Sequence, residues 1–478
     1  MLKTYLIFDL GTGNSRAALV TSDFDVIGMS AFENKYYKDS EYEDAQYFVP
    51  EEWKASLFGA CSELLKANPG VHVSGITASG ARESIVLYDK EGKAFLGLPN
   101  IDNRGRRWVG GIGDKGYIYE KTGRWVTEDF PAAKLLGLMK KKPDEYGRTA
   151  KITSLSEWIG EIFTGKIVIE PSQACETQLF DIDRMEWSDT LCRYYGIDAN
   201  ILPDVQNSGT LLGTVKHDIA AAFDLPLETP FIVGGADTQI AVKSTRCNYN
   251  DTVVVSGTTS PVATLLDRKF YDREERCWTD CNLSGKGYQV ETNPGVTGLN
   301  FQRFKDNFLT NVPYSVIDKA VAEKESFLCT ASFSSLLFSE RRSLKTGGFI
   351  MKSPFDANFD IYDMAWAVLA DIACSIFEQY NNLCTMIPNR KDYILCCGGG
   401  FKSPLLCQML SDLSAKHVIL YYNYDKASAV GCAEICNEYF NIRSAHENQK
   451  DKTYRPGSGE LIKRYHDIWR NNRMLLNK

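Results

Sequence analysis

The sequence predicts an α/β protein in which two lobes of the same kind face each other across a cleft. A strand–turn–strand unit occurs once in each half of the 478-residue chain, at residues 5–20 (YLIFDLGTGNSRAALV) and 252–265 (TVVVSGTTSPVATL). Predicted helices alternate with short apolar strands along both halves, as in α/β lobes. We expect the boundary near residues 245–251, which divides the chain into lobes of residues 1–246 and 247–478.

The turn of the first unit is suited to hold an anion. Gly11 and Gly13 have no side chain, so backbone N–H groups can come close to a phosphate. Side-chain donors and one positive charge follow at Thr12, Asn14, Ser15 and Arg16. Asp9, at the end of the preceding strand, could hold Mg²⁺ through water. The pattern favours the phosphates of ATP-Mg over an ordinary hairpin turn.

This turn differs from two other glycine-rich phosphate loops, GxxxxGK[ST] and GxGxxG, because both of those open a helix. DxGTxxxR on a hairpin is similar to the phosphate loop of the actin, hexokinase and Hsp70 superfamily. The second turn, residues 256–260 (SGTTS), would grip another part of the triphosphate through Thr258.

Composition and charge exclude several classes of protein. The chain has 54 basic and 61 acidic residues, so its formal charge of −7 gives no electrostatic case for nucleic acid or an anionic membrane. No apolar run approaches the ~20 residues of a membrane span, and the N-terminal run is too short for a signal peptide. We therefore expect a cytoplasmic protein. Its 14 cysteines lie in apolar settings and are expected to be small buried hydrophobes rather than a zinc site.

Apolar periodicity and turn residues predict the other elements. Helical periodicity extends over residues 44–68, where Pro50 and the acidic pair Glu51-Glu52 mark the start of the helix. Further helices are expected at residues 131–142, 154–163, 298–308, 360–386 and 403–415, and strands at 71–79, 84–88, 231–235 and 393–397. Ser154 is the expected N-cap of its helix, with Glu157 three residues on. Gly398-Gly399-Gly400 lies between a strand and a helix. Because these glycines have no side chains, a ligand can contact the backbone there, which suits an adenosine pocket.

Asp237 is the candidate catalytic base. It follows the predicted strand at 231–235, where the chain should open into the cleft, and Gly234 and Gly235 beside it would leave room for a substrate. A carboxylate of ordinary pKa suffices, because the acceptor hydroxyl becomes acidic only as the P–O bond forms. A helix N-cap or a surface turn is the alternative interpretation of this residue.

Several motifs in one order resemble the FGGY family of carbohydrate kinases from Asp9 to about Ala433. They are DLGTGNSR, PAAKLL, SEWIGEIFTGKIVIEPSQACETQLFDI, VGGADTQ, SGTTS, GLNFQRFKD and CGGGFKSPLLCQMLSDL. The resemblance implies two actin-like (ribonuclease H-like) lobes. It also implies transfer of the γ-phosphoryl group of ATP, with Mg²⁺, to a primary hydroxyl of a small open-chain sugar or polyol.

The resemblance also implies roles for individual residues. The substrate would be bound by Arg82, Glu83, Asp102, Asp237 and Gln239, with Trp125 or Phe130 as an apolar wall. The nucleotide would be bound by Thr12, Gly13, Asn14, Arg16, Thr258, Gly298, Gln302, Gly400 and Phe401. Asp9 and Asp237 would hold the metal.

The branch of the family stays open. ARESIVLYD (81–89) and NIDNRGRR (100–107) look most like the autoinducer-2 kinases. Arg82-Glu83 also resembles the polyol-contacting pair of glycerol kinases, and Asp102 with Arg104 resembles the D-x-R of pentulose and hexulose kinases. The Met-His-Gly usual in xylulose kinases is replaced by Ala-Ser-Gly at 78–80. A dihydroxypentanedione-like hydroxyketone and a ketopentose are the leading substrates, with glycerol as a further alternative.

Two other classes compete with a kinase: an actin-like or Hsp70-like ATP switch, and a sugar sensor without catalysis. Asp237 beside the glycines, with Arg82 and Glu83, argues against a switch. The presence of both Asp9 and Asp237 argues against lost catalysis. The expected partners are therefore a sugar and ATP. The sequence is silent on oligomeric state, and a homodimer is the common assembly of such enzymes.

Overall fold

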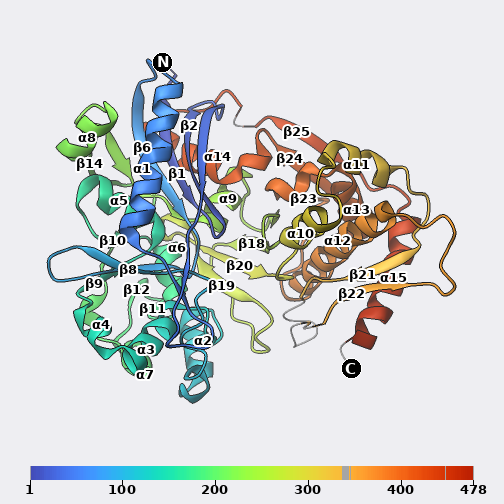
Figure 1. Cartoon of the computed structure of the whole chain (residues 1–478), viewed down its shortest axis with the longest axis horizontal. Helices are drawn as coiled ribbons and strands as arrows, with labels where there is room; N and C mark the ends of the chain where they lie inside the picture. The colour runs from blue at the N-terminus through green and yellow to red at the C-terminus, as the bar shows by residue number, and fades with distance from the viewer. Residues whose placement is uncertain (1, 336–343, 345, 447, 477–478) are drawn as a thin grey trace.

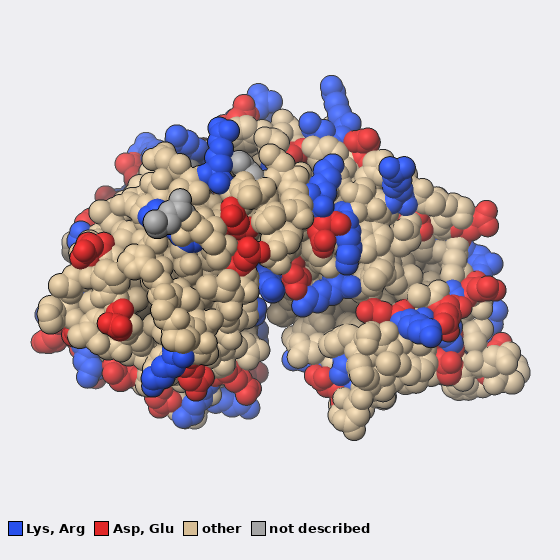
Figure 2. Space-filling view, turned by 90° about the horizontal axis from the view of Figure 1, so that it is seen from above, with Lys and Arg blue, Asp and Glu red and all other residues tan. Residues whose placement is uncertain are grey.

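The computed structural model describes residues 2–335, 344, 346–446 and 448–476. The chain forms two bodies, and each is built on a seven-stranded sheet. In Figure 1 the N-terminal half, blue to green, lies on the left, and most of the C-terminal half, yellow to red, lies on the right. Seen from above in Figure 2, the surface is indented between the two bodies.

The first sheet carries the first glycine turn at the tip of a hairpin. β1 (Thr4–Leu10) and β2 (Asn14–Thr21) are antiparallel, and β3 (Val26–Glu33) extends them. β6 (Val73–Gly80) runs parallel to β1 on its other side. The sheet is completed by β14 (Leu211–Thr214), β15 (Pro230–Ile232) and β16 (Gly235–Ala236).

Side chains of β1 alternate between two layers, because the sheet is covered on both faces. Phe8 packs in a cluster with α1 (Pro50–Ala67) and α5 (Leu155–Thr164), and α8 (His217–Phe223) belongs to the same layer. Ile7 packs on the other face with α14 (Ala427–Phe440), a helix from the C-terminal half.

The rest of the N-terminal half lies below this sheet in Figure 1. A three-stranded sheet there has the order β8 (Ala94–Leu98), β7 (Ile85–Tyr88), β9 (Lys151–Thr153). The larger helices are α2 (Lys115–Thr122), α3 (Pro131–Lys141) and α7 (Asp189–Tyr195). Shorter elements are β4 (Tyr37–Lys38), β5 (Gln46–Tyr47), α4 (Pro143–Arg148), β10 (Val168–Ile169), α6 (Pro171–Ala174), β11 (Phe180–Asp181), β12 (Glu186–Trp187) and β13 (Asp204–Val205).

The second sheet repeats the arrangement of the first around its own glycine turn. β17 (Thr252–Val255) and β18 (Val262–Leu266) form an antiparallel hairpin, and β23 (Tyr393–Cys397) runs parallel to β17 as β6 does to β1. The other strands are β19 (Trp278–Cys281), β20 (Tyr288–Thr292), β24 (His417–Tyr421) and β25 (Lys450–Tyr454). The duplicated unit predicted from the sequence is confirmed.

The core of the C-terminal half forms around α12 (Ile361–Met386), the longest helix among the described residues. Its apolar side chains meet those of the second sheet and of the neighbouring helices. These are α10 (Gly298–Phe308), α11 (Tyr314–Ala322), α13 (Pro404–Ser414) and α15 (Glu460–Leu476). A small hairpin of β21 (Cys329–Ser332) and β22 (Gly348–Met351) completes this body.

Two helices lie between the sheets and join the halves. α9 (Asp237–Ser244) places Val242 in a cluster with residues of the second sheet, and α14 packs on α9 and on the first sheet. A second junction forms where β19 meets α2. There the N–H of Thr279 donates to the carbonyl oxygen of Gly123 at 3.1 Å, and the Tyr119 hydroxyl donates to that of Cys277 at 2.8 Å.

Most predicted elements match the observed ones within a few residues, with two informative differences. The helical periodicity begins at residue 44, but Gln46–Tyr47 forms β5, and the helix starts at Pro50, where the sequence predicts its start. Ser154 does precede α5, but its hydroxyl donates to the Glu157 carboxylate and caps no backbone N–H. None of the described helices is both long and apolar enough to cross a lipid bilayer.

Candidate functional site

Three polar side chains hold the first glycine turn from one side. Asn34 Nδ2 donates to the carbonyl oxygens of Gly11 (2.7 Å) and Thr12 (3.2 Å), and the Tyr36 hydroxyl donates to the same Thr12 oxygen at 2.6 Å. Asn100 Nδ2 donates to Thr12 Oγ1 at 2.8 Å. The carbonyl oxygens of the turn are therefore engaged by the protein.

The tip of this turn is open to a ligand. Gly13 and Asn14 are exposed, and a Cβ placed on Gly13 would meet nothing within 4 Å. Arg16 lies across the hairpin from Asp9, with Nε 3.6 Å from Oδ2. Exposed backbone donors beside a guanidinium suit a phosphate.

The second glycine turn is held by the start of α10. The N–H of Thr297 donates to the carbonyl oxygen of Thr258 at 3.0 Å, and the hydroxyls of Thr297 and Ser260 lie 2.7 Å apart. A Cβ on Gly298 would approach the carbonyl oxygen of Gly257 to 2.1 Å. Only glycine allows this approach, which brings a helix N-terminus to the turn.

The glycine triplet reaches the same turn from β23. The N–H of Gly400 donates to the carbonyl oxygen of Ser256 at 3.1 Å. A Cβ on Gly398 would meet that oxygen at 2.3 Å, and one on Gly400 would meet Ser256 Oγ at 2.1 Å. The second turn, the start of α10 and the triplet, predicted separately, therefore meet at Ser256 and Gly257.

The other predicted nucleotide residues are exposed or buried to different degrees. Thr258 is exposed at the turn, and Gln302 is exposed on α10. The Phe401 side chain is fully buried in the C-terminal core, which leaves only its backbone for a nucleotide.

Asp237 is the first residue of α9, and its carboxylate accepts the N–H of Thr238 at 2.7 Å. Burial raises the pKa of Asp237 to about 7, Arg82 opposes the increase, and Asp9 and Glu83 add to it. Charged groups from β1, the loop after β6 and α9 therefore lie close together. The pKa of this half-buried carboxyl is therefore raised above the ordinary value assumed from the sequence.

The glycines before Asp237 serve the backbone rather than a substrate. A Cβ on Gly234 would approach the carbonyl oxygen of Ala78 to 1.8 Å, and one on Gly235 would lie 3.0 Å from Ser172 Oγ. The same hydroxyl accepts the N–H of Ala236 at 3.0 Å. The expectation that these glycines leave space for substrate is wrong, because β6 and Ser172 fill that space.

Asp9 lies at the end of β1 beside Asp237. Burial raises its pKa, while Arg16, Ser79 and Ser428 oppose the increase. Asp9 raises the pKa of Asp237, and two neighbouring carboxylates are suitable hard ligands for Mg²⁺. The residues present therefore fit that ion.

Arg82 lies at the inner end of the site and is only 8% exposed. Its Nη1 and Nη2 donate to the two carboxylate oxygens of Glu291 in β20, at 2.8 and 3.1 Å. Nη1 also lies 3.7 Å from Glu176 and 3.6 Å from Asp280. The guanidinium expected at the sugar is therefore fixed by carboxylates from both halves.

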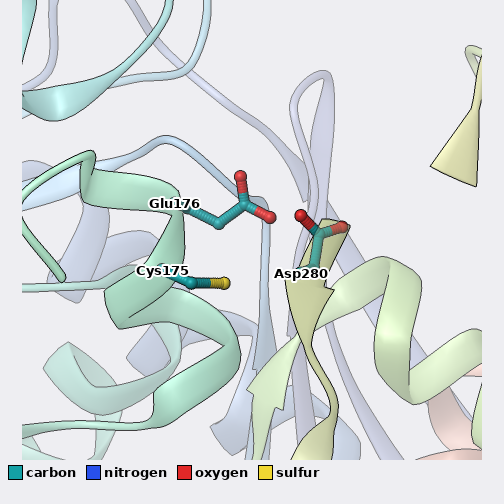
Figure 3. A group of neighbouring side chains, drawn as sticks. All are labelled: Cys175, Glu176 and Asp280. Carbon is teal, nitrogen blue, oxygen red and sulfur yellow. The ribbon is translucent and has the colours of Figure 1, made fainter. Parts of the chain in front are cut away.

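Figure 3 shows Glu176 and Asp280 with their carboxylates turned toward each other and Cys175 beside them. The ligand atoms of these three residues lie within 4.8 Å of one another. Arg124 Nη2 lies 2.5 Å from Glu176 and 2.6 Å from Asp280, so a guanidinium already supplies the positive charge that these carboxylates need. This cluster is an internal ion-pair network rather than a metal centre.

Glu83 and Asp102 are fixed by Lys134 and Arg104. Glu83 has a φ of 58°, and its carbonyl oxygen accepts a hydrogen bond from Lys134 Nζ at 2.6 Å. Asp102 is fully buried and accepts the Arg104 Nε–H at 2.7 Å and the Gln46 N–H at 3.0 Å. Because both carboxylate oxygens of Asp102 are already engaged, a supporting role in the loop around residue 102 is favoured over direct contact with the sugar.

Of the remaining predicted sugar contacts, Gln239 and Phe130 are buried and Trp125 is half-buried. Gln239 is 1% exposed and lies two positions after Asp237 on α9. Trp125 and Phe130 pack on Trp278 of β19, with ring centroids 5.2 and 6.2 Å away. An apolar wall does form here, and it includes a residue of the C-terminal half.

Sequence reasoning missed Glu291, Asp280, Arg124, Glu176 and Lys134. No local pattern marks them, because their partners are up to 209 positions away, as for Arg82 and Glu291. The sequence feature that could have indicated them is a charged residue inside an otherwise apolar segment, such as Lys134 in PAAKLL.

Known proteins resemble this chain over most of its length. The N-terminal domain of the FGGY family of carbohydrate kinases matches residues 4–243. YoaC of Bacillus subtilis (strain 168), described as a sugar kinase, is 39% identical over 442 residues, 92% of this chain and 91% of YoaC. The autoinducer-2 kinase of Escherichia coli (strain K12) is 25% identical over 464 residues, 90% of this chain and 85% of that protein.

Solved structures show the same fold at lower identity. Plasmodium falciparum glycerol kinase with ADP has a TM-score of 0.85 at 17% identity, and the match covers 99% of this chain and 98% of that one. Ligand-bound xylulose kinase from Lactobacillus acidophilus has a TM-score of 0.84 at 16% identity, with the same coverage. Both support the predicted pair of actin-like lobes. The match at residues 4–243 and the 39% identity to YoaC establish that the chain belongs to the FGGY family of carbohydrate kinases, phosphotransferases that use ATP and an alcohol acceptor.

Proposed function

We propose that this kinase transfers the γ-phosphoryl group of ATP to a primary hydroxyl of a small open-chain sugar or polyol, with a dihydroxypentanedione-like hydroxyketone as the leading substrate. The observation that carries the chemistry is the position of Asp237. It lies at the start of α9, a helix between the two sheets, with Arg82, Glu83 and Asp9 close enough to change its pKa.

The two glycine turns would hold the triphosphate. In the N-terminal lobe (residues 1–246), Thr12, Gly13, Asn14 and Arg16 would approach the β- and γ-phosphates. In the C-terminal lobe (residues 247–478), Thr258 would contact them from the other side. Gly298, Gln302, Gly400 and Phe401 would hold the rest of the nucleotide, with Phe401 contributing through its backbone.

Asp9 and Asp237 would hold Mg²⁺, which when bound would neutralise phosphate charge. Asp237 would take the proton from the acceptor hydroxyl at a carboxylate oxygen as the new P–O bond forms. Burial raises the pKa of Asp237 above that of an ordinary aspartate, which strengthens its affinity for that proton.

The sugar would lie against Arg82, Glu83 and Asp237, with Gln239 as a further contact. Asp102 would support the neighbouring loop through its hydrogen bonds from Arg104 and the Gln46 N–H. A dihydroxypentanedione-like substrate is favoured because the autoinducer-2 kinase of Escherichia coli matches 90% of the chain. The ketopentoses and glycerol are the alternative substrates within the same chemistry.

The experiment is ADP release measured over a panel of ketopentoses, glycerol, other polyols and dihydroxypentanedione. We expect one of these compounds to stimulate ADP release strongly in the wild-type enzyme. The Asp237→Asn enzyme should bind ATP but respond to none of them. Sugar binding without ADP release would indicate a sensor, and sugar-independent ATP turnover would indicate an ATP switch.

A further inference from the structure

Arg82, which the proposed function places at the sugar, cannot be oriented by its own lobe alone. It follows β6 in the N-terminal half, yet both of its terminal nitrogens donate to Glu291 of β20 in the C-terminal half. This bidentate geometry fixes the plane of the guanidinium as well as its position.

Glu291 is itself oriented by neighbours on its own strand and in the loop that follows. Asn293 Nδ2 donates to one carboxylate oxygen at 3.2 Å, and Gln289 Nε2 lies 3.4 Å from the other. The Glu291 side chain is fully buried, and the positive charge of Arg82 lowers its pKa despite that burial. A charged, immobile acceptor therefore faces Arg82.

No other carboxylate near Arg82 among the described residues offers it a pairing equivalent to that with Glu291. Glu176 and Asp280, the other carboxylates within 4 Å of it, lie 2.5 and 2.6 Å from Arg124. Glu291 gives Arg82 its closest contact, at 2.8 Å, and its only bidentate one among the described residues.

We propose that Glu291 is a positioning residue of the sugar site, contributed by the C-terminal lobe, which holds Arg82 in the orientation that receives the sugar. The sugar site is then complete only where β20 of the second sheet meets the loop after β6. This inference depends on the proposed sugar-binding role of Arg82.

The test is a double-mutant cycle on the Arg82–Glu291 pair, read as KM for the sugar that stimulates the wild-type enzyme. Glu291→Gln keeps the shape but removes the charge. It should raise the sugar KM at least about tenfold, because one partner of a buried charge pair is lost. The KM for ATP should change less than about twofold, a separation that a general loss of structure would not give.

The cycle shows whether Glu291 acts through Arg82. In an Arg82→Gln background, adding Glu291→Gln should change the sugar KM by less than about twofold. An undiminished tenfold effect in that background, or an equal rise in the KM for ATP, would overturn the inference. Failure of every sugar to stimulate the wild-type enzyme would instead reject the proposed function.

Two further variants keep the test decisive if Glu291→Gln does not fold. Asn293→Ala removes one donor to Glu291 without changing any charge and should raise the sugar KM by about two- to fivefold. Asp272→Asn is the matched control for Glu291→Gln, because Asp272 is also buried and forms a bidentate pair, with Arg276, in the same half. An Asn293→Ala enzyme with the sugar KM of the wild type would contradict the proposal.

Discussion

Lys134 Nζ donates to the carbonyl oxygen of Glu83 at 2.6 Å and to that of Pro99 at 2.7 Å, so one buried ammonium group joins the two loops of the proposed sugar site. Burial lowers the pKa of Lys134 to about 8, although Asp102 and Glu83 oppose this decrease. Glu83 has the left-handed φ of 58°, a conformation that a non-glycine residue keeps only when its surroundings hold it.

Replacing Lys134 by methionine should therefore raise the sugar KM at least about fivefold, since small displacements of a positioning loop are costly. The KM for ATP should stay close to that of the wild type. Steady-state kinetics in both substrates checks this. Equal sensitivity of both KM values would mean that Lys134 serves general stability alone.

Gly298→Ala should weaken nucleotide binding selectively. The added Cβ would come within 2.1 Å of the Gly257 carbonyl oxygen and push the second glycine turn away from α10. We expect the ATP KM to rise about tenfold with little change in sugar binding. Gly116→Ala, at the start of α2 where a Cβ meets nothing within 4 Å, is the matched control. Similar ATP KM values for the two variants would contradict the assignment.

The stability of the protein should depend on pH through Glu157. Burial raises the pKa of Glu157 to about 7, although hydrogen bonds from Ser154 and Ser156 oppose the increase. Because the folded-state pKa is raised from 4.5, its stabilising contribution is complete below about pH 4.5 and is lost as the pH rises through 7.

The free energy of unfolding of the wild type, relative to Glu157→Gln, should thus fall by about 3 kcal/mol between pH 4.5 and pH 8. Denaturant titrations of both proteins across this range give the difference directly. A difference that stays constant with pH would show that Glu157 is not protonated in the folded protein.

ATP hydrolysis should be slow without a sugar, because the reacting phosphate must be shielded from water before transfer. ADP release by the wild-type enzyme with ATP-Mg alone should be a small fraction of the sugar-stimulated rate. Equal rates of ADP release with and without the sugar would contradict the expectation that ATP turnover requires the sugar as acceptor.

The sequence predicted those parts of the site that have local signatures. The turns around Gly13 and Thr258 and the triplet at Gly400 are short runs of glycine and hydroxyl residues, and at Gly398 and Gly400 the close approach of Ser256 leaves no room for a side chain. Repetition of the hairpin then predicted two lobes. These features were recognisable because each depends on residues close together in the chain.

The sequence could not predict interactions that depend on the packing of distant segments. Arg82 was expected to contact the sugar, but its pairing with Glu291, 209 positions away, could not be predicted. The pKa of Asp237 depends on its burial between sheets, and Phe401 lies in a core whose neighbours come from distant helices. Residue type at one position carries no information about such neighbours.

The most direct test of the account is the rate of phosphoryl transfer by Asp237→Asn at saturating sugar and ATP-Mg. Removing the proton acceptor should lower kcat by about 100- to 10,000-fold, while ATP binding, measured by calorimetry, stays close to that of the wild type. A variant that transfers phosphate at near wild-type rate would contradict the role of Asp237 as the base.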